Sequence, residues 1–278
     1  IIPGEVIGAV INGTNRFLEN MVAQGVTIHH AGGETADVGD IVRTIDVGIT
    51  AFGRIKRNEL VINNIQPGNV VVGLASFGQS TYENAYNGGM GSNGLTSARH
   101  DVFAKVYAEK YPDSFNPAIP NEVVYAGSKL LTDMVSINGE QITAGKLVLS
   151  PTRTYLPVIK SILDAHKPAI TGLIHCSGGG QTKVLHFIDK VHIIKNNFFE
   201  VPPLFAMIQE ESKTDWKEMY KVFNMGCRLE VYTDATTANA IIEIAKSYQI
   251  DAQIIGHVEA AESRKVTMDT AYGKFEYC

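Results

Sequence analysis

Segments typical of β-strands alternate with segments typical of helices in the second half of the chain, and this alternation limits the possible folds more than any other feature. The pattern predicts, in order, helix over 151–166, strand over 169–176, a glycine-rich loop with a short helix, strand over 191–196, two helices between 203 and 222, strand over 227–233, helix over 235–248 and strand over 252–260. Such alternation is typical of sheets covered by helices. We therefore expect a layered α/β or α+β domain.

The first half of the chain has a less regular pattern. It predicts a helix over 3–25, strands over 26–31, 44–53 and 70–78, an irregular loop over 79–94, and helices over 95–111 and 121–135. Long loops inside compact domains are usually functional or mobile. A length of 278 residues fits about two domains.

The composition argues against several classes of protein. The 24 basic and 29 acidic side chains give a net charge of −5, whereas non-specific binders of nucleic acid carry clustered Lys and Arg. No apolar run approaches the roughly 18 residues of a membrane-spanning helix. Three cysteines without a CxxC pair favour reduced thiols in the cytoplasm over a disulfide framework or a zinc site. A small anionic ligand is compatible with this composition.

The motif GGETA at residues 32–36 stands at the end of a predicted strand. Its glycines allow a tight turn, and the carboxylate of Glu34 could serve a metal ion or a donor group of a ligand. Taken alone, the motif is explained more simply as a strand-to-strand turn with a solvated glutamate.

The motif GSNG at residues 91–94 opens the predicted helix that carries Arg99. Ser92 and Asn93 could cap this helix, and free amides at its start could attract an anion together with the arginine. The alternative is a plain helix cap after a flexible loop.

The motif PTR at residues 151–153 repeats this arrangement. It places Thr152 and Arg153 at the head of the next predicted helix, behind a proline that suits a first helical turn. The alternative is an ordinary helix start with a solvated arginine.

The motif HCSGGG at residues 175–180 lies between an apolar strand and a helix. Three consecutive glycines are costly in backbone entropy, so we expect something to approach this backbone closely. The sequence contains neither GxGxxG nor GxxxxGK[ST], which argues against a Rossmann or P-loop site. His175 alone is more simply a structural histidine. In FNMGC at 223–227, we interpret Asn224 and Gly226 as turn residues.

Taken in this order, the motifs resemble those of the aminoimidazole ribonucleotide synthetase family, also called phosphoribosylformylglycinamidine cyclo-ligases. The resemblance runs from residue 1 to about residue 260 and rests on GGETA, GLAS followed by GSNG, SPTRTY, IHCSGGG and MYKVFNMGC. Several such motifs in one order are far more specific than any single one. The resemblance therefore favours the functional interpretation of each glycine loop.

The sequence departs from this family in two places. The longer connection FGQSTYENAYNGGM replaces the usual short one between GLAS and GSNG. The family's N-terminal segment, with acidic and DGxGTK-like motifs that serve ATP and metal, has no counterpart here, and the chain starts without Met or a signal peptide. We expect the chain to begin inside the first domain.

The resemblance implies two α/β domains in a cytoplasmic homodimer without nucleic-acid or membrane partners. Residues 1–75 would be the remainder of an N-terminal ATP-binding domain that forms a shared barrel with its copy. Residues 76–278 would be the C-terminal layered α/β domain.

The resemblance also implies a reaction of purine biosynthesis. ATP would phosphorylate the amide oxygen of formylglycinamidine ribonucleotide, and the ring nitrogen would then attack the activated carbon to close the imidazole, with ATP and Mg²⁺ as cofactors. His175 would donate to or position the reacting oxygen, and Glu34 would serve a metal or the substrate amine. The residues implied for phosphate binding are Ser92, Asn93, Gly94, Arg99, Thr152, Arg153, Gly178, Gly179 and Gly180.

Two other functions stay open. Another ATP-dependent phosphoryl-transfer enzyme of the superfamily, such as thiamine-monophosphate kinase, selenophosphate synthetase or the hydrogenase-maturation dehydratase, would share this architecture, but SPTRTY together with HCSGGG favours the cyclo-ligase. A non-catalytic scaffold would account for a chain without the ATP-serving segment.

Overall fold

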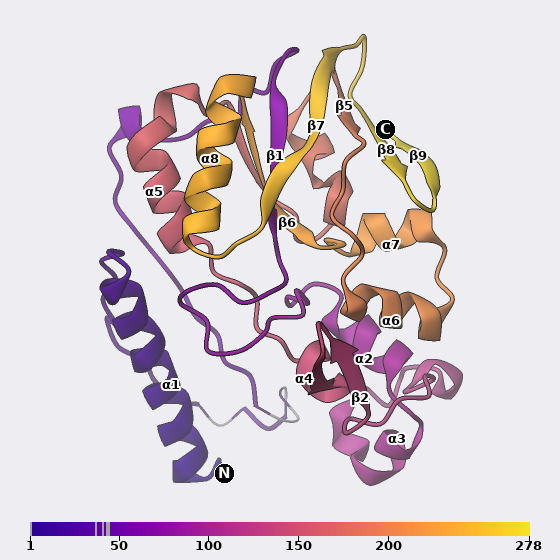
Figure 1. The fold of residues 1–278 in the computed structure, drawn as a ribbon. Coiled ribbons are helices and arrows are strands. Elements are labelled where there is room, and N and C mark those ends of the chain that lie inside the picture. Colours follow the sequence, from indigo (N-terminus) through magenta and orange to yellow (C-terminus); the bar gives the residue numbers. More distant parts are fainter. Residues whose placement is uncertain (1, 37, 41, 43–44) are drawn as a thin grey trace.

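A seven-stranded mixed sheet is the centre of the structure, a computed structural model that describes residues 2–36, 38–40, 42 and 45–278 (Figure 1). In spatial order the strands are β4 (Gly172–His175), β6 (Cys227–Thr233), β1 (Val70–Ala75), β7 (Ala252–Ala260), β5 (Val191–Lys195), β8 (Lys265–Thr270) and β9 (Gly273–Tyr277). Neighbouring strands are antiparallel, except that β5 and β8 are parallel. The α/β architecture predicted for the second half is confirmed.

Helices pack on both faces of this sheet (Figure 1). One face carries α5 (Leu156–His166) and α8 (Ala235–Ser247), and the other carries α6 (Pro203–Ser212), α7 (Trp216–Val222) and the 3₁₀ helix η5 (Gly180–Phe187). Consecutive β1 residues serve different faces: Val71 joins the core under α6, whereas Val72 joins the core under α5 and α8. Successive side chains of a strand point to opposite faces, so an apolar run such as VVVGLA suits a strand buried on both sides.

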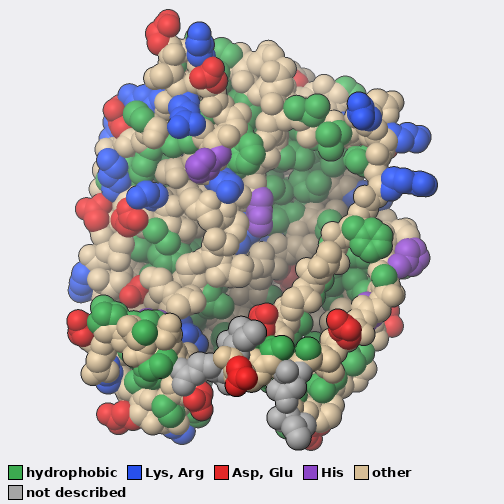
Figure 2. Space-filling view, turned by 180° about the vertical axis from the view of Figure 1, so that it is seen from behind, with side chains coloured by type: hydrophobic (Ala, Val, Ile, Leu, Met, Phe, Trp, Pro, Cys, Tyr) green, Lys and Arg blue, Asp and Glu red, His purple; other side chains and the backbone are tan. Residues whose placement is uncertain are grey.

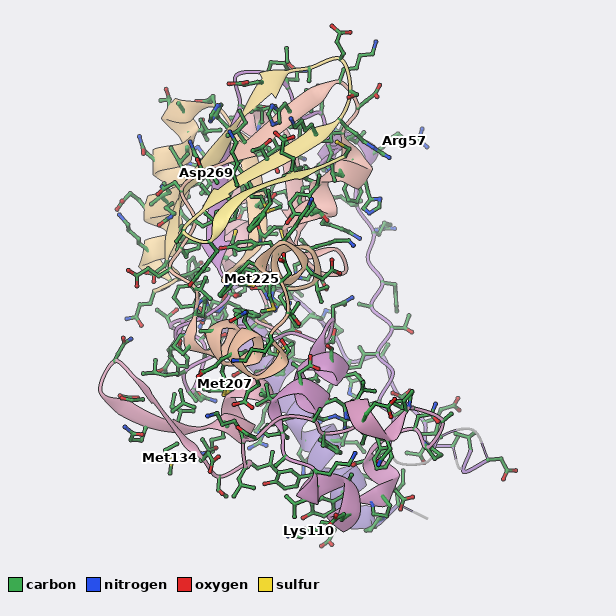
Figure 3. All side chains as sticks on the ribbon, turned by 90° about the vertical axis from the view of Figure 1, so that its right-hand side faces the viewer. Arg57, Lys110, Met134, Met207, Met225 and Asp269 are labelled. Carbon is green, nitrogen blue, oxygen red and sulfur yellow. The ribbon has the colours of Figure 1, made fainter. Side chains whose placement is uncertain are left out.

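A smaller unit of short elements lies below the sheet in Figure 1. It contains α2 (Leu95–Val102), α3 (Val106–Lys110), α4 (Ala144–Val148), the hairpin of β2 (Met134–Ile137) with β3 (Glu140–Thr143), and the 3₁₀ turns η2 (Pro112–Ser114) and η3 (Asn121–Val123). Figure 3 shows the turn at Met225 between this unit, marked by Met134 and Lys110, and the strand that carries Asp269. The unit therefore adjoins the loops at one end of the sheet.

The helix predicted over 121–135 does not form. Instead the chain runs in an extended conformation beside the end of α2, where a Cβ on Gly127 would lie 2.3 Å from the carbonyl oxygen of Val102. The same stretch then enters the β2–β3 hairpin, whose turn residues Asn138 and Gly139 have φ values of 52° and 86°. An Asn-Gly pair with positive φ at both residues is the preferred two-residue hairpin turn, and it overrides the helical spacing of the apolar residues.

Two other helix predictions need correction. The helix predicted over 95–111 is divided into α2 and α3, because Phe103 between them has extended backbone and bridges to Lys129. The helix predicted from residue 151 begins at Leu156, so PTR precedes it in irregular backbone. The hairpin of β8 with β9 was not predicted at all.

The N-terminal part of the chain is a helix followed by a mostly irregular segment. The predicted helix is confirmed as α1 (Gly4–Ala23), and among the described residues of the irregular segment that follows only the 3₁₀ turn η1 (Arg57–Glu59) is regular. The strands predicted over 26–31 and 45–53 are absent, and residue 44 lies outside the described residues. Ile49, for example, is 76% exposed. A strand needs a neighbour to pair its backbone groups, and the described residues offer none here.

Residues 63–65 join this segment to the outermost strand, β4. The Asn64 amide donates to the Thr171 carbonyl oxygen at 2.6 Å, and the Leu173 amide donates to Oδ1 of Asn63 at 2.9 Å. Ile65 is buried against Gly172. Because residues 63–65 contact β4, and β1 pairs with β6 and β7 in the middle of the sheet, we propose a domain boundary before residue 63 in place of the expected boundary between 75 and 76.

Two predictions from the composition can be compared with the structure. All three cysteines are free thiols, of which Cys176 and Cys227 are buried. In the part of the chain that the structure describes, no helix combines the length and the apolar character needed to cross a membrane.

Candidate functional site

Two glycine loops from distant parts of the sequence meet beside the end of β4. The loop 91–94 contacts the loop 175–180 through a hydrogen bond from Oγ of Ser177 to Oδ1 of Asn93 at 2.9 Å. A Cβ on Gly178 would lie 3.1 Å from Nδ2 of the same Asn93. Figure 2 shows that the face seen from behind is hollowed, with histidine and basic side chains at the upper border of the depression. The space beside the two glycine loops is called the hollow below. The structure thus brings together two of the sequence motifs.

The backbone amides of both loops are available for a ligand. Within the described residues, the amides of residues 91–94, Gly178 and Gly179 donate to no acceptor. Gly94 begins α2 with a left-handed φ of 82° and without a side-chain cap, so the expected capping by Ser92 and Asn93 is wrong. Unpaired amides gathered at a helix start form a concavity that suits an anion.

The three glycines of the second loop are needed for different reasons. All have positive φ: 58° at Gly178, 104° at Gly179 and 47° at Gly180. A Cβ on Gly180 would lie 2.5 Å from the carbonyl oxygen of Phe223, so the chain's own backbone makes the close approach there. A Cβ on Gly179 would have no neighbour nearer than 3.7 Å. Gly179 is therefore the position where the structure leaves space for another molecule.

The charged groups around His175 are all basic. Its exposed ring makes no hydrogen bond within the described residues. Partial burial, followed by the charges of Arg228 and Lys183, lowers the pKa of His175 below its ordinary value. Lys183 forms no ion pair with any described residue. The imidazole is therefore neutral at neutral pH and can donate an N–H, while the two cations give the hollow a positive potential.

Arg228 on β6 is a buried cation that the sequence analysis missed. It is only 2% exposed, and its Nη2 donates to the carbonyl oxygens of Gly89 and Met90 at 2.7 Å each. Its Nε has no hydrogen-bond partner among the residues that the structure describes, and burial lowers the pKa of this guanidinium. Its position in a predicted strand could have drawn attention to it. Every residue of β6 is buried, and an arginine in a buried strand indicates a charged partner or a binding site.

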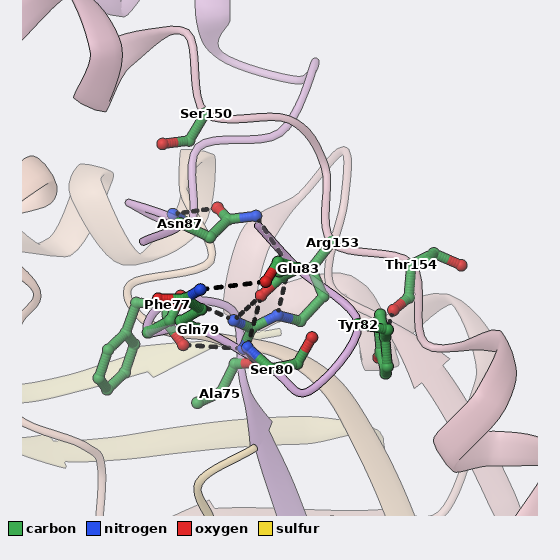
Figure 4. Close-up of polar contacts among 12 residues, drawn as sticks. Ala75, Phe77, Gln79, Ser80, Tyr82, Glu83, Asn87, Ser150, Arg153 and Thr154 are labelled. Carbon is green, nitrogen blue, oxygen red and sulfur yellow. Dashed lines mark hydrogen bonds and ion pairs between the residues drawn. The ribbon is translucent and has the colours of Figure 1, made fainter. Parts of the chain in front are cut away.

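Arg153, expected to bind phosphate, is fully engaged by the chain itself (Figure 4). Its Nε and Nη2 donate to the carboxylate of Glu83 at 3.0 and 2.7 Å. Its remaining donors go to the carbonyl oxygens of Ala75, Phe77 and Gly78 at 2.8–3.0 Å. A guanidinium has five N–H donors, so none is left for a ligand. The neighbouring Thr152 is exposed and precedes α5 by several residues.

The ion pair of Arg153 with Glu83 also fixes the long loop 79–91. Burial alone would raise the pKa of Glu83, but the hydrogen bonds and charge of Arg153 hold it below its ordinary value. Oε2 of Glu83 accepts from the Ser80 amide, and Asn87 donates to both Glu83 and the Pro151 carbonyl oxygen. The loop is therefore held in a defined conformation.

The side chains of two other expected site residues, Arg99 and Glu34, make no hydrogen bond or ion pair with the glycine loops among the described residues. Arg99 places its guanidinium 5.8 Å from the centre of the Tyr125 ring, with Nε unpaired. Glu34 is exposed in the irregular segment after α1, and no hydrogen bond or ion pair joins it to either loop among the described residues. The described residues also contain no cluster of three or more His, Cys, Asp or Glu side chains that could hold a metal.

A network of buried polar side chains connects the residues that flank both glycine loops. Lys195 donates to the carbonyl oxygen of Gln181 at 2.7 Å and pairs with Glu230, and both charged side chains are fully buried. The amide of Gln181 donates to the carbonyl oxygen of Asn224 at 2.6 Å. Asn224 in turn donates to the carbonyl oxygen of Gly89 at 2.9 Å. Asn224 also starts the turn predicted at FNMGC, which is confirmed by the hydrogen bond from the Cys227 amide to its carbonyl oxygen.

Comparison with known proteins gives a consistent family. The family model described as "AIR synthase related protein, C-terminal domain" matches residues 66–269. The phosphoribosylformylglycinamidine cyclo-ligase of Methanocaldococcus jannaschii is 30% identical over 262 residues, which are 92% of this chain and 63% of that protein. The enzyme of the same name from Methanococcus vannielii is 32% identical over 84% of this chain and 56% of its own length. The chain thus spans about 60% of the length of these relatives.

Solved structures match more weakly. They include T. maritima PurL complexed with FGAR, with a TM-score of 0.39 and 14% identity over 79% of this chain and 29% of that chain. E. coli HypE, a hydrogenase maturation protein, has a TM-score of 0.39 and 15% identity over 77% of this chain and 51% of that chain. Scores at this level carry no conclusion about the activity of the chain.

Proposed function

Because the chain belongs to the AIR synthase-related family, we propose that it serves the ATP-dependent cyclisation of formylglycinamidine ribonucleotide to aminoimidazole ribonucleotide in purine biosynthesis. The observation that carries this proposal is the meeting of the loops 91–94 and 175–180 with unpaired amides and unpaired cations around them. Both substrates of such a reaction carry phosphate groups, and a concavity lined by unpaired amides binds phosphate groups.

The reaction would proceed in two steps. The amide oxygen of the substrate attacks the γ-phosphorus of ATP, which releases ADP, and loss of the amide N–H proton to solvent leaves an iminophosphate. The amidine nitrogen that becomes part of the ring then attacks the activated carbon and loses its proton, and the C–O bond breaks to release phosphate together with the original oxygen. The chain's contribution is to orient these groups and to stabilise the charge that develops on the oxygens.

The residues of the hollow suit this contribution. The amides of Gly178, Gly179 and loop 91–94 would hold phosphoryl oxygens. His175, neutral because its pKa is lowered, would donate an N–H to the amide or phosphoryl oxygen. Arg153 would shape the wall of the site through Glu83. We retain Ser92, Asn93, Gly94 and Gly180 as loop residues of this site.

The remaining expectations stay part of the proposal. They are a cytoplasmic homodimer, a barrel-forming N-terminal domain that contributes to ATP binding, and a requirement for Mg²⁺ with Glu34 as a possible ligand. Because the described residues show no cluster of metal ligands, we assign no step to the metal. Arg99 and Thr152 have no role that their contacts explain.

The proposal is tested on a complete version of the protein that includes the N-terminal ATP-binding domain, by measuring phosphate release from ATP with different acceptors. We expect release with formylglycinamidine ribonucleotide and none with thiamine monophosphate or selenide. The variant His175→Ala should reduce kcat at least tenfold, because it removes a donor to the reacting oxygen. The matched control His186→Ala changes an exposed histidine of η5 and should leave kcat unchanged. Equal release with the other acceptors, or none with the ribonucleotide, contradicts the proposal.

A further inference from the structure

We propose that Arg228 binds the phosphoryl group in this site, so that the arginine on β6, and not the one in the PTR motif, is the ligand-binding arginine. The ligand class is a phosphate dianion, either a sugar phosphate monoester or the terminal phosphate of a nucleotide. The inference rests on the proposed function only for the identity of the molecule that carries the phosphate.

The first argument is the missing counter-ion of Arg228. Three Lys or Arg side chains are buried within the described residues. Arg153 pairs with Glu83 and Lys195 pairs with Glu230, whereas Arg228 pairs with no carboxylate of the described residues. A buried charge without a partner is strongly unfavourable. An anionic ligand would supply the partner that the protein itself supplies to the other two cations.

The second argument is the placement of the guanidinium against the first glycine loop. Its Nη2 is oriented by the carbonyl oxygens of Gly89 and Met90, which leaves Nε and Nη1 without acceptors in the described part of the chain. A Cβ on Gly91 would lie 2.1 Å from Nη1, so only glycine lets the backbone pass this close. The unpaired amides of residues 91–94 begin at this same point. The cation and the free donors are thus directly adjacent.

The third argument is the contact of Arg228 with the second glycine loop. Its carbonyl oxygen accepts from the Cys176 amide at 2.6 Å, inside the HCSGGG motif. The charge of Arg228 also lowers the pKa of His175, the residue before Cys176. Arg228 is therefore anchored between the two loops whose amides are unpaired, and the charge of Lys183 also acts on His175.

The direct test follows the arginine side chains while inorganic phosphate is added. In ¹H–¹⁵N spectra of the whole chain, the Nε–H signal of Arg228 should shift with phosphate concentration, and the signal of Arg153 should stay in place because its donors are already occupied. Signals are assigned with Arg228→Lys and Arg153→Lys. A shift of Arg153 without a shift of Arg228, or no phosphate binding at all, overturns the inference.

A calorimetric test compares a substitution that removes the charge of Arg228 with one that keeps it. Arg228→Gln should weaken phosphate binding by about tenfold or more, since it removes a charged donor. Arg228→Lys, which keeps the charge without the planar fork, should lose less. The matched control Arg57→Gln removes an exposed arginine of η1 and should change the affinity less than twofold. Equal affinity in Arg228→Gln contradicts the inference, and the spectra of the unchanged chain decide if that variant does not fold.

Two further ligands separate the possible sources of the phosphate. Ribose 5-phosphate carries the monoester of the ribonucleotide, and ADP carries a nucleotide phosphate; the one that shifts the Arg228 signal at lower concentration identifies the class. The result is also independent of turnover. An Arg228 shift without cyclisation activity would remove the proposed function and keep this inference, whereas activity with an unmoved Arg228 signal would do the opposite.

Discussion

The loop 79–91 and the loop 175–180 both contact Arg228, yet their polar groups are treated in opposite ways. Next to the first loop, Arg153 uses all five of its N–H donors on the chain's own oxygens, among them the carboxylate of Glu83 in that loop. In the second, Gly178 and Gly179 leave their amides unpaired, and the nearby His175, Lys183 and Arg228 have no acidic partner among the described residues. Satisfied groups define a shape, whereas unsatisfied groups mark the place of a ligand.

This difference predicts two kinds of variant. Substitutions in satisfied networks should cost stability and leave the ligand affinity of the folded molecules nearly unchanged. Substitutions at Gly178 and Gly179, whose amides are unpaired, should do the reverse. The predictions below test this separation.

The largest loss of stability is expected for Lys195→Met. The substitution leaves the carboxylate of Glu230 fully buried without its cation, which should lower the free energy of unfolding by about 3–5 kcal/mol. Urea unfolding measures this change. The double variant Lys195→Met with Glu230→Leu removes both charges and should regain more than half of the loss. A double variant no more stable than the single one would show that the ion pair is not the cause.

A smaller loss is expected for Gly180→Ala. The new Cβ would meet the carbonyl oxygens of Phe223 and Tyr220 at 2.5 and 2.7 Å, and the residue would keep a φ of 47°. Overpacking and backbone strain together should cost about 2–4 kcal/mol in urea unfolding. If Gly180→Ala were as stable as the unchanged chain, the close approach of α7 to this loop would be refuted.

A still smaller loss is expected for Glu83→Gln. The substitution removes the charge that Arg153 pairs with and weakens the ties of the loop, which should cost about 1–3 kcal/mol. The control Glu218→Gln breaks an exposed pair with Lys221 and should cost less than about 0.5 kcal/mol. Equal effects of the two variants would mean that burial adds nothing to the Arg153 pair.

The same pair predicts how stability depends on pH. The pKa of Glu83 is lower in the folded chain than its ordinary value of 4.5, so the folded state favours the ionised form. This contribution is fully present above pH 4.5 and is lost as the pH falls through the lowered folded pKa. Urea unfolding between pH 6 and pH 3 should therefore show a smaller decline in Glu83→Gln than in the unchanged chain. Parallel curves would contradict the assignment.

The smallest loss of stability, with a large loss of affinity, is expected for Gly179→Ala. Its Cβ meets no close neighbour, so only the strain of a φ of 104° remains, about 1 kcal/mol. Phosphate affinity should fall at least tenfold, because the methyl group occupies the free space beside the amides. Gly139→Ala is the matched control: it also has positive φ and open space, but lies in the β2–β3 turn. If both variants bind phosphate normally, the explanation from the unpaired amides fails.

The sequence predicted the layered fold wherever local pattern and pairing partner agree. The strands over 169–176, 191–196, 227–233 and 252–260 have neighbours in the sheet and form as expected. Residues 45–53 have the alternation of a strand but no partner among the described residues, so no strand forms. A sequence pattern describes a single segment, whereas a strand forms only when a second segment pairs with it.

The candidate site was predicted only in part for a related reason. Glycine motifs can be recognised in a sequence, and the structure does bring loops 91–94 and 175–180 together. The roles of the arginines depend on their partners, which are distant in the sequence. Glu83 lies 70 residues from Arg153, and no sequence motif predicts that ion pair. Arg228 stands in the strand predicted over 227–233, and a charged residue in a buried strand was the feature of the sequence that could have indicated a site there.

The contacts of residues 63–65 with β4 have a consequence for solubility. An outermost strand presents a row of unpaired amides and carbonyls that can pair with the same strand of another molecule and start aggregation. The Asn64 amide occupies the Thr171 carbonyl oxygen, Asn63 occupies the Leu173 amide, and Ile65 covers Gly172. This short segment therefore protects the strand that carries His175, and it keeps the candidate site from becoming a point of edge-to-edge association between molecules.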